Sequence, residues 1–198
     1  MNARTLAALS LLNELRHAAL DTLARKHKHP ALLLFYSFID ICASLAEETP
    51  AKSNCERFEN YLSCYALSSW KTFRPYDLWA ARSSLLHAYS PLGDHTDKPN
   101  GAQLIFYFVW PETEEQMRTL LLARGYSNFL LVDVSTIKHI AVSSFNGLWM
   151  RIENDPEFSK IFQGNAAHLL KDSHYIRLEE ELTLLDELAK LREEQTQA

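Results

Sequence analysis

The segment that most constrains the fold spans residues 31–48. It follows Pro30, a residue type favoured at the first position of a helix, and it is apolar on nearly every side of that helix. Such a helix is stable only when other elements cover it all round, so the sequence predicts a helical bundle with this segment at its centre. Asp40 is the single charged residue inside the apolar run, so its carboxylate must pair with a base or face a cleft.

Three further helices are expected in the first 92 residues. Apolar residues recur at helical spacing over 5–28, a third helix starts at a cap on Ser53 or Asn54 and ends near residue 69, and a fourth is entered through Pro75 and stopped at Pro91. The loops between the four helices are short, which is typical of antiparallel neighbours. We therefore expect an antiparallel helical bundle over residues 1–92.

The pattern changes after the fourth helix. Residues 103–110 and 128–134 are β-branched and aromatic and are separated by a short helical segment, which predicts two parallel strands joined by a helix. Two more helices follow, one over 137–154 after a cap on Ser135 or Thr136 and one from 155 onward. Residues 178–198 form a charged amphipathic helix. The expected fold class is α+β and predominantly α, with an α/β elaboration over 101–177 packed on the bundle.

The overall charge and the cysteines narrow the class of protein. A formal net charge of −5 gives no global positive field, so any nucleic-acid binding depends on a local patch. Three cysteines are too few for a disulfide framework, and an odd number fits a reducing compartment. The N-terminal residues do not resemble a signal peptide, and the longest apolar run is far short of a membrane span. We expect a soluble, cytoplasmic protein without a membrane partner.

Most signatures of enzymes and cofactor sites are missing from the sequence. It contains no glycine-rich phosphate loop, no nucleophile elbow and no H-E-x-x-H motif. Asp94, His95 and Asp97 lie together in a polar loop, but such a cluster is more often exposed to solvent than bound to a metal. We expect neither a cofactor nor a metal.

The fourth helix carries the most informative motif. Asp77, Arg82 and His87 are its only ionisable side chains apart from tyrosine, and the segment Arg82-Ser-Ser-Leu-Leu-His87 resembles the R-x₄₋₆-H motif of the HEPN superfamily. Members of that family are compact helical bundles, and many are metal-independent ribonucleases of toxin and defence systems. The resemblance covers about residues 1–92. It implies an endoribonuclease of toxin or phage-defence type that acts on RNA as a homodimer, with a cognate antitoxin or other partner protein.

The chemistry that the resemblance implies needs a base and a cation. His87 titrates near neutrality and suits the removal of the 2′-OH proton, and Arg82 has a fork geometry that suits a phosphate. Side chains five residues apart on a helix point about 140° apart, so two copies of the motif in a dimer would form a shared cleft. Asp40 is expected to orient one of the pair. The side chains expected to contact RNA, by charge or by base stacking, are Lys52, Arg57, Lys71, Arg74, Tyr76, Trp79, Ser83 and Tyr89.

Other interpretations of the same residues stay open. Arg82 would pair with Asp40 or Asp77 for purely structural reasons, and His87 would then be a core histidine with its hydrogen bonds satisfied. The chain would in that case be a non-catalytic helical interaction module that binds a protein or a nucleotide. A third interpretation is a structural protein whose acidic, leucine-bearing C-terminal segment drives assembly.

Overall fold

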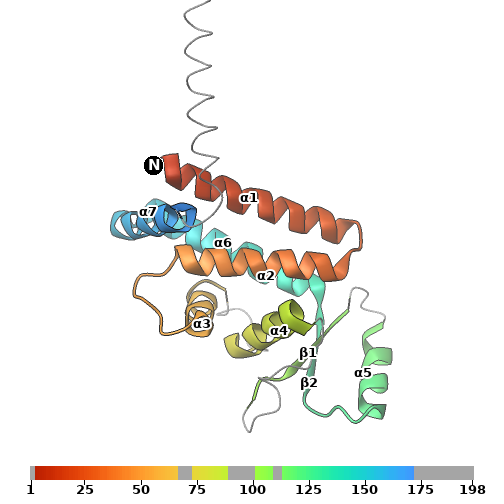
Figure 1. Cartoon of the computed structure of the whole chain (residues 1–198). Coiled ribbons are helices and arrows are strands. Elements are labelled where there is room, and N and C mark those ends of the chain that lie inside the picture. Colours follow the sequence, from red (N-terminus) through yellow and green to blue (C-terminus); the bar gives the residue numbers. More distant parts are fainter. Residues whose placement is uncertain (1–2, 67–72, 89–100, 109–112, 172–198) are drawn as a thin grey trace, which may run out of the picture.

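The computed structural model describes residues 3–66, 73–88, 101–108 and 113–171, which form a mostly helical fold with one small parallel sheet (Figure 1). This architecture confirms the predicted α+β, predominantly α class. None of the described helices is long and apolar enough to cross a membrane. The elements, in chain order, are α1 (Ala3–Ala24), α2 (Lys28–Leu45), α3 (Asn54–Tyr65), α4 (Pro75–Ala88), β1 (Leu104–Phe108), α5 (Glu114–Ala123), β2 (Phe129–Asp133), α6 (Val134–Asn154) and α7 (Pro156–Lys171).

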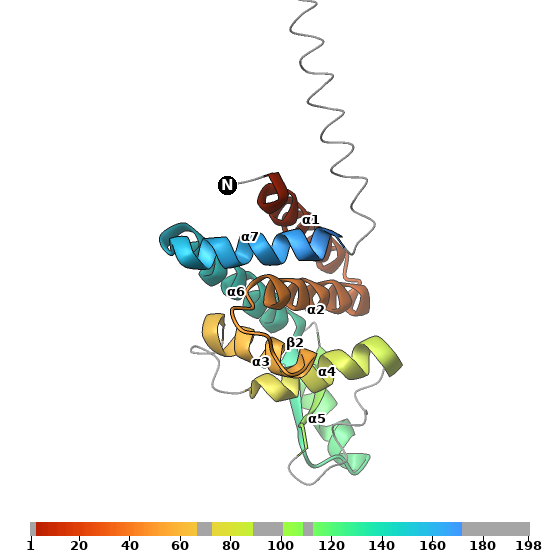
Figure 2. The same cartoon turned by 60° about the vertical axis from the view of Figure 1, so that its left-hand side comes forward.

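Helix α2 is the central element, as its apolar sequence predicts. It packs against α1, α3, α4, α6 and α7, and half of its residues are buried (Figure 1). Helix α1 covers one side of α2, whereas α3 and α4 lie on the opposite side. Figure 2 shows α7 beside α2 on the side away from α3 and α4, whereas α6 runs alongside α2 and also packs against α3. An apolar helix covered in this way has no need of a polar face.

One apolar core joins the first and last described helices. Its buried side chains extend from Ala8 on α1 to Ala166 on α7, and α1 packs directly on α7. The helices of the expected segments 1–92 and 101–177 therefore contribute to the same cluster, and the division between these segments stays a prediction. The expected C-terminal helix over 178–198 lies outside the described residues.

The sheet consists of two parallel strands, in agreement with the strand–helix–strand pattern. Leu104 pairs with Phe129 and Phe108 with Asp133. Contacts between the sheet and α2 centre on Tyr107, whose hydroxyl lies 2.5 Å from that of Tyr36, while its carbonyl accepts a hydrogen bond of 2.9 Å from Lys28 Nζ. Burial raises the pKa of both phenols above the ordinary value.

Side-chain caps fix several helix ends, and one differs from the prediction. Ser53 caps α3 as expected, by accepting a hydrogen bond from the Glu56 amide. Helix α6, in contrast, begins at Val134 and is capped by Asp133, which accepts a hydrogen bond from the Ser135 amide. The predicted cap on Ser135 or Thr136 is thus wrong by two or three positions, because the last residue of β2 already supplies the carboxylate.

Candidate functional site

Arg82 of α4 forms an ion pair with Asp40 of α2. Its Nε and Nη2 atoms donate to Asp40 Oδ2 over 2.7 Å and 2.5 Å, respectively. The guanidinium also lies 4.7 Å from the centre of the Trp79 ring, in a cation–π contact. The two charged side chains are 20% and 25% exposed, so the pair is largely buried but remains reachable from solvent. Asp40 and Trp79 together hold the guanidinium in one orientation.

The carboxyl group of Asp40 is under two opposing influences. Burial raises its pKa, and the positive charges of Arg82 and Arg57 lower it in part, with burial the larger effect. The ionised form of this carboxyl group is therefore favoured by its guanidinium partners and disfavoured by its burial. This dependence couples the charge of Asp40 to the position of Arg82.

A small cavity of about 110 Å³ opens beside this ion pair. Arg57 reaches it from α3 and brings a second guanidinium, which contacts Glu47 Oε2 at 3.4 Å and donates to the side-chain oxygen of Asn54. Two arginines and one carboxylate give the cavity a net positive formal charge, which suits an oxyanion. The lining residues are Asp40, Ala43, Ser44, Asn54, Arg57, Phe58 and Arg82.

Arg74 makes different contacts from those expected of an RNA-binding side chain. Its Nε and Nη2 atoms donate to the two carboxylate oxygens of Asp77 at 2.9 Å and 2.6 Å, and Nη2 also reaches the Gly101 carbonyl. Asp77 is only 1% exposed at its side chain and accepts a further hydrogen bond from the Gln103 amide. Arg74 and Asp77 therefore tie the start of α4 to the chain just before β1, and Arg82 pairs with Asp40 instead of Asp77.

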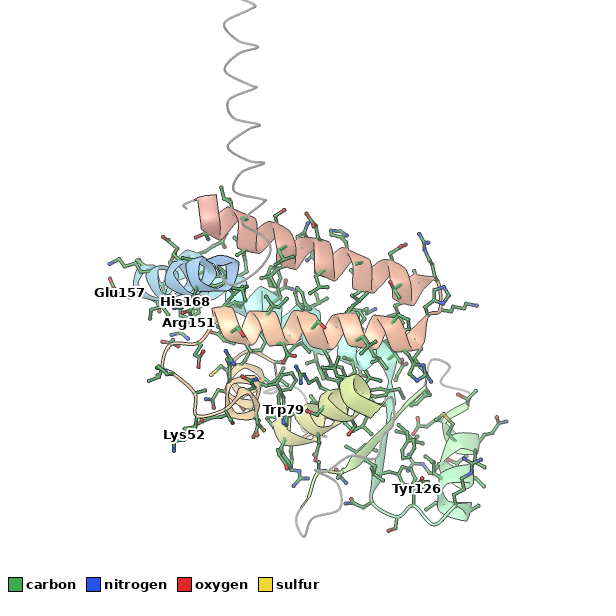
Figure 3. The ribbon with its side chains drawn as sticks, in the orientation of Figure 1. Lys52, Trp79, Tyr126, Arg151, Glu157 and His168 are labelled. Carbon is green, nitrogen blue, oxygen red and sulfur yellow. The ribbon has the colours of Figure 1, made fainter. Side chains whose placement is uncertain are left out.

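The remaining predicted residues are only partly described. Ser83 lies on α4, half-buried, and does not line the small cavity. His87 lies in the last turn of α4, but its side chain is outside the described set, as are all of Lys71 and Tyr89. The structure thus brings Asp40, Arg57 and Arg82 together. Trp79, expected as a base-stacking residue, is 8% exposed and packs against Phe58 and the Arg82 guanidinium (Figure 3).

The sequence did not point to a second, larger cavity that adjoins the first. It lies between α3 and the turn after α2, has a volume of about 430 Å³, and shares Ala43 and Arg57 with the small cavity. Tyr61 and Tyr65 of α3 form part of its wall. Only the packing of that turn against α3 creates the cavity, so spacing along the chain carries no signal for it.

No three His, Cys, Asp or Glu side chains among the described residues are grouped as a metal site would require. Comparisons with known proteins give no further guide to the site. No family model matches the chain, and neither a curated protein nor a solved structure shows significant similarity to it.

Proposed function

We propose that the chain is a HEPN-like, metal-independent endoribonuclease of toxin or phage-defence type, and that the small cavity at Arg82 binds the scissile phosphate of RNA. The observation that carries this proposal is the pairing of two guanidiniums at one cavity, with Arg82 held in place by Asp40 and Trp79. A cation that is positioned in advance stabilises a developing negative charge without the cost of reorganisation. The resemblance of the motif from Arg82 to His87 to that of HEPN ribonucleases supports the same function.

The reaction follows from the roles of the two motif residues. His87 removes the 2′-OH proton, the 2′ oxygen attacks the phosphorus, and the bond to the 5′ oxygen breaks. Arg82 stabilises the charge on the pentacoordinate phosphorus group, with Arg57 as a second donor. The 5′ oxygen leaves with a proton from a histidinium. The products are a 2′,3′-cyclic phosphate and a 5′-OH end.

The proposed active form is a homodimer. Arg82 faces Asp40 and α2, and a residue five positions later on the same helix points about 140° away. One chain therefore cannot easily direct both side chains at one phosphate. In a dimer, two copies of the motif line a shared cleft, so Arg82 of one protomer and the partner's His87 can approach the same phosphate. Once that histidine has taken the 2′-OH proton, it is the histidinium that protonates the leaving oxygen.

A non-catalytic interaction module is the alternative function. It is favoured by the fact that Arg82 already donates two hydrogen bonds to Asp40, as a purely structural arginine would. Such a module would bind a protein or nucleotide partner at the same surface without cleaving RNA. The two functions differ in one measurable property, cleavage in the absence of metal.

The test is cleavage of end-labelled RNA in EDTA by the wild type and by the variants Arg82→Met and His87→Ala. Arg82→Met keeps the aliphatic stem against Trp79, which preserves packing while it removes the charge. We expect the rate to fall by roughly 10²-fold or more in each variant. The products should carry cyclic-phosphate ends.

Two matched variants control for nonspecific effects. Arg118→Met removes a half-exposed arginine on α5 that pairs with Glu114, and His139→Ala removes an exposed histidine on α6. Both should cleave RNA at the wild-type rate, and circular dichroism should show that all four variants are folded. Absence of cleavage by folded wild-type protein on diverse RNAs would reject the nuclease and favour the interaction module.

A further inference from the structure

The larger cavity has the size of a ligand-binding site. Its volume of about 430 Å³ lies within the range usual for small-molecule sites, roughly 300–1,000 Å³. It opens to solvent between α3 and residues 46–52, and Lys52 projects from that turn (Figure 3). Its lining includes three carboxylates, Glu47, Glu48 and Glu56, together with Asn60, Tyr61 and Tyr65.

The position of this cavity relates it to the proposed phosphate site. Arg57 and Ala43 line both cavities, so the two cavities are adjacent, and a ligand with its phosphate beside Arg57 and Arg82 has the larger one next to it. In an RNA chain, the group one step from the scissile phosphate is the ribose and base of the nucleotide on its 5′ side. The larger cavity is therefore positioned to bind the ribose and base of that nucleotide.

The carboxylates of the larger cavity indicate which part of a nucleotide fits. Glu47 accepts from the Ala51 amide at 2.6 Å, Glu56 accepts from the Lys52 amide at 2.6 Å, and Glu48 pairs with Arg151. Lys52 and Arg57 also line the cavity, so the three carboxylates leave it with a formal net charge of −1, which disfavours a second phosphate. A carboxylate has more acceptor positions than one or two donors occupy, so the same groups can accept from an amino group of a ligand.

The remaining lining groups suit a planar, polar ring. Tyr65 is half-buried, and its ring lies 5.2 Å from that of Tyr61, which forms a short aromatic wall. Asn60 is exposed at the cavity, and its amide has no hydrogen-bond partner among the residues that the structure describes. An amide offers one acceptor and two donors, the combination that proteins use to recognise the edge of a base.

We propose that the larger cavity binds the base on the 5′ side of the scissile phosphate and selects cytosine and adenine, which carry an amino group at C4 or C6, over bases with a carbonyl at that position. The amino group donates to the carboxylates or to the Asn60 oxygen, and the ring lies against Tyr65. Uracil and hypoxanthine present a carbonyl oxygen at the same place, which faces the carboxylates with no hydrogen to share. The assignment of the phosphate to Arg57 and Arg82 rests on the proposed function.

Binding of matched nucleotides tests this selectivity directly. Calorimetry with 3′-CMP and 3′-UMP, and with 3′-AMP and 3′-IMP, compares probes that differ at the exocyclic group. We expect the amino-bearing member of each pair to bind about tenfold more tightly, the lower end of what one good base contact provides. Asn60→Ala should reduce this preference, whereas Asn13→Ala, an exposed asparagine on α1, should leave it unchanged.

Cys64 reports where the nucleotide binds. It lines the larger cavity and is exposed, whereas burial raises the pKa of the Cys42 thiol to about 12, and burial with the neighbouring Glu59 raises that of Cys55 to about 12. The Cys64 thiol should therefore react fastest with Ellman's reagent, and Cys64→Ser should abolish the fast phase. Saturating 3′-CMP should slow this phase at least several-fold if the base occupies the cavity.

The outcomes separate this inference from the proposed function. If RNA is cleaved in an Arg82-dependent way but the paired nucleotides bind equally and Cys64 is not protected, the base site is wrong and the nuclease stands. If no RNA is cleaved but 3′-CMP binds preferentially, protects Cys64 and loses its preference in Asn60→Ala, the base site stands and the nuclease is wrong. Absence of both cleavage and preferential binding overturns both.

Discussion

The ion pair between Asp40 and Arg82 should contribute measurably to stability, and a double-mutant cycle isolates its contribution. We propose the single variants Asp40→Ala and Arg82→Met and the double variant. The methionine keeps apolar contact with Trp79, so the cycle reports the loss of the ion pair rather than the loss of packing. Unfolding in urea, followed by circular dichroism at pH 7, gives the free energy of unfolding of each protein.

The expected magnitude follows from the burial of the pair. Fully exposed ion pairs contribute about 0–1 kcal/mol, and removal of one partner from a fully buried pair costs about 3–5 kcal/mol. Arg82 and Asp40 are 20% and 25% exposed, and both donor atoms meet the same oxygen within 2.7 Å. These values place the cost of each single variant at about 2–3 kcal/mol and the coupling energy at about 2 kcal/mol.

Measurements at lower pH test whether the charge of Asp40 causes the loss of stability in Arg82→Met. Burial already places the pKa of Asp40 above its unfolded value, and loss of the guanidinium raises it further. An ionised Asp40 therefore destabilises Arg82→Met at pH 7. This cost declines as the pH falls from the raised folded-state pKa toward the unfolded value of about 3.9, below which the carboxyl is neutral in both states. A coupling energy below about 0.5 kcal/mol, or a cost that is constant between pH 7 and pH 4, would refute the reasoning.

Three further variants test the contacts that hold the elements together. Asn165→Ala removes the amide that donates to the Leu45 and Glu47 carbonyls at 3.1 Å and 2.8 Å, and should cost about 1–3 kcal/mol in urea unfolding. Ser53→Ala removes the cap of α3 and should cost about 1 kcal/mol in the same assay. The double variant Tyr36→Phe/Tyr107→Phe should lose less free energy of unfolding than the wild type as the pH rises above 10. Both buried phenols keep their protons above pH 10 while the unfolded chain releases them, so wild-type stability should fall with rising pH by up to about 2.7 kcal/mol per unit more than that of the double variant. Equal slopes of unfolding free energy against pH in the two proteins would contradict the role of the buried phenols. Unchanged stability of Asn165→Ala or Ser53→Ala would contradict the contribution of that side chain's hydrogen bonds.

The helices and strands could be predicted from the sequence where the spacing of apolar residues matches the side chains that the fold buries. Helix α2 is apolar all round and is central, and the strand–helix–strand spacing correctly gives parallel strands. The start of α6 was missed because Asp133, Ser135 and Thr136 are all good caps, and their order along the chain does not decide between them.

The site was less predictable because it depends on contacts between helices. The sequence offered Arg82 two carboxylates, Asp40 and Asp77, and helical geometry places Asp77 on another side of α4 from Arg82. The cavity beside Arg57 depends on how residues 46–52 turn against α3, and no residue pattern encodes that turn. Sequence can therefore name the charged residues of the site but not the space between them.

Because α7 packs on α1 and α2, the core around α2 can be completed only late in synthesis of the chain. The Asn165 side chain holds the end of α2 across 120 positions of the chain, and α1 also packs on α7. Contacts of such long range slow folding, because the intervening chain must be ordered before they form. A ribosome that has released only residues 1–92 therefore exposes an apolar α2 that lacks two of its covering helices. The apolar surface of α2 is therefore fully covered only after α7 has emerged.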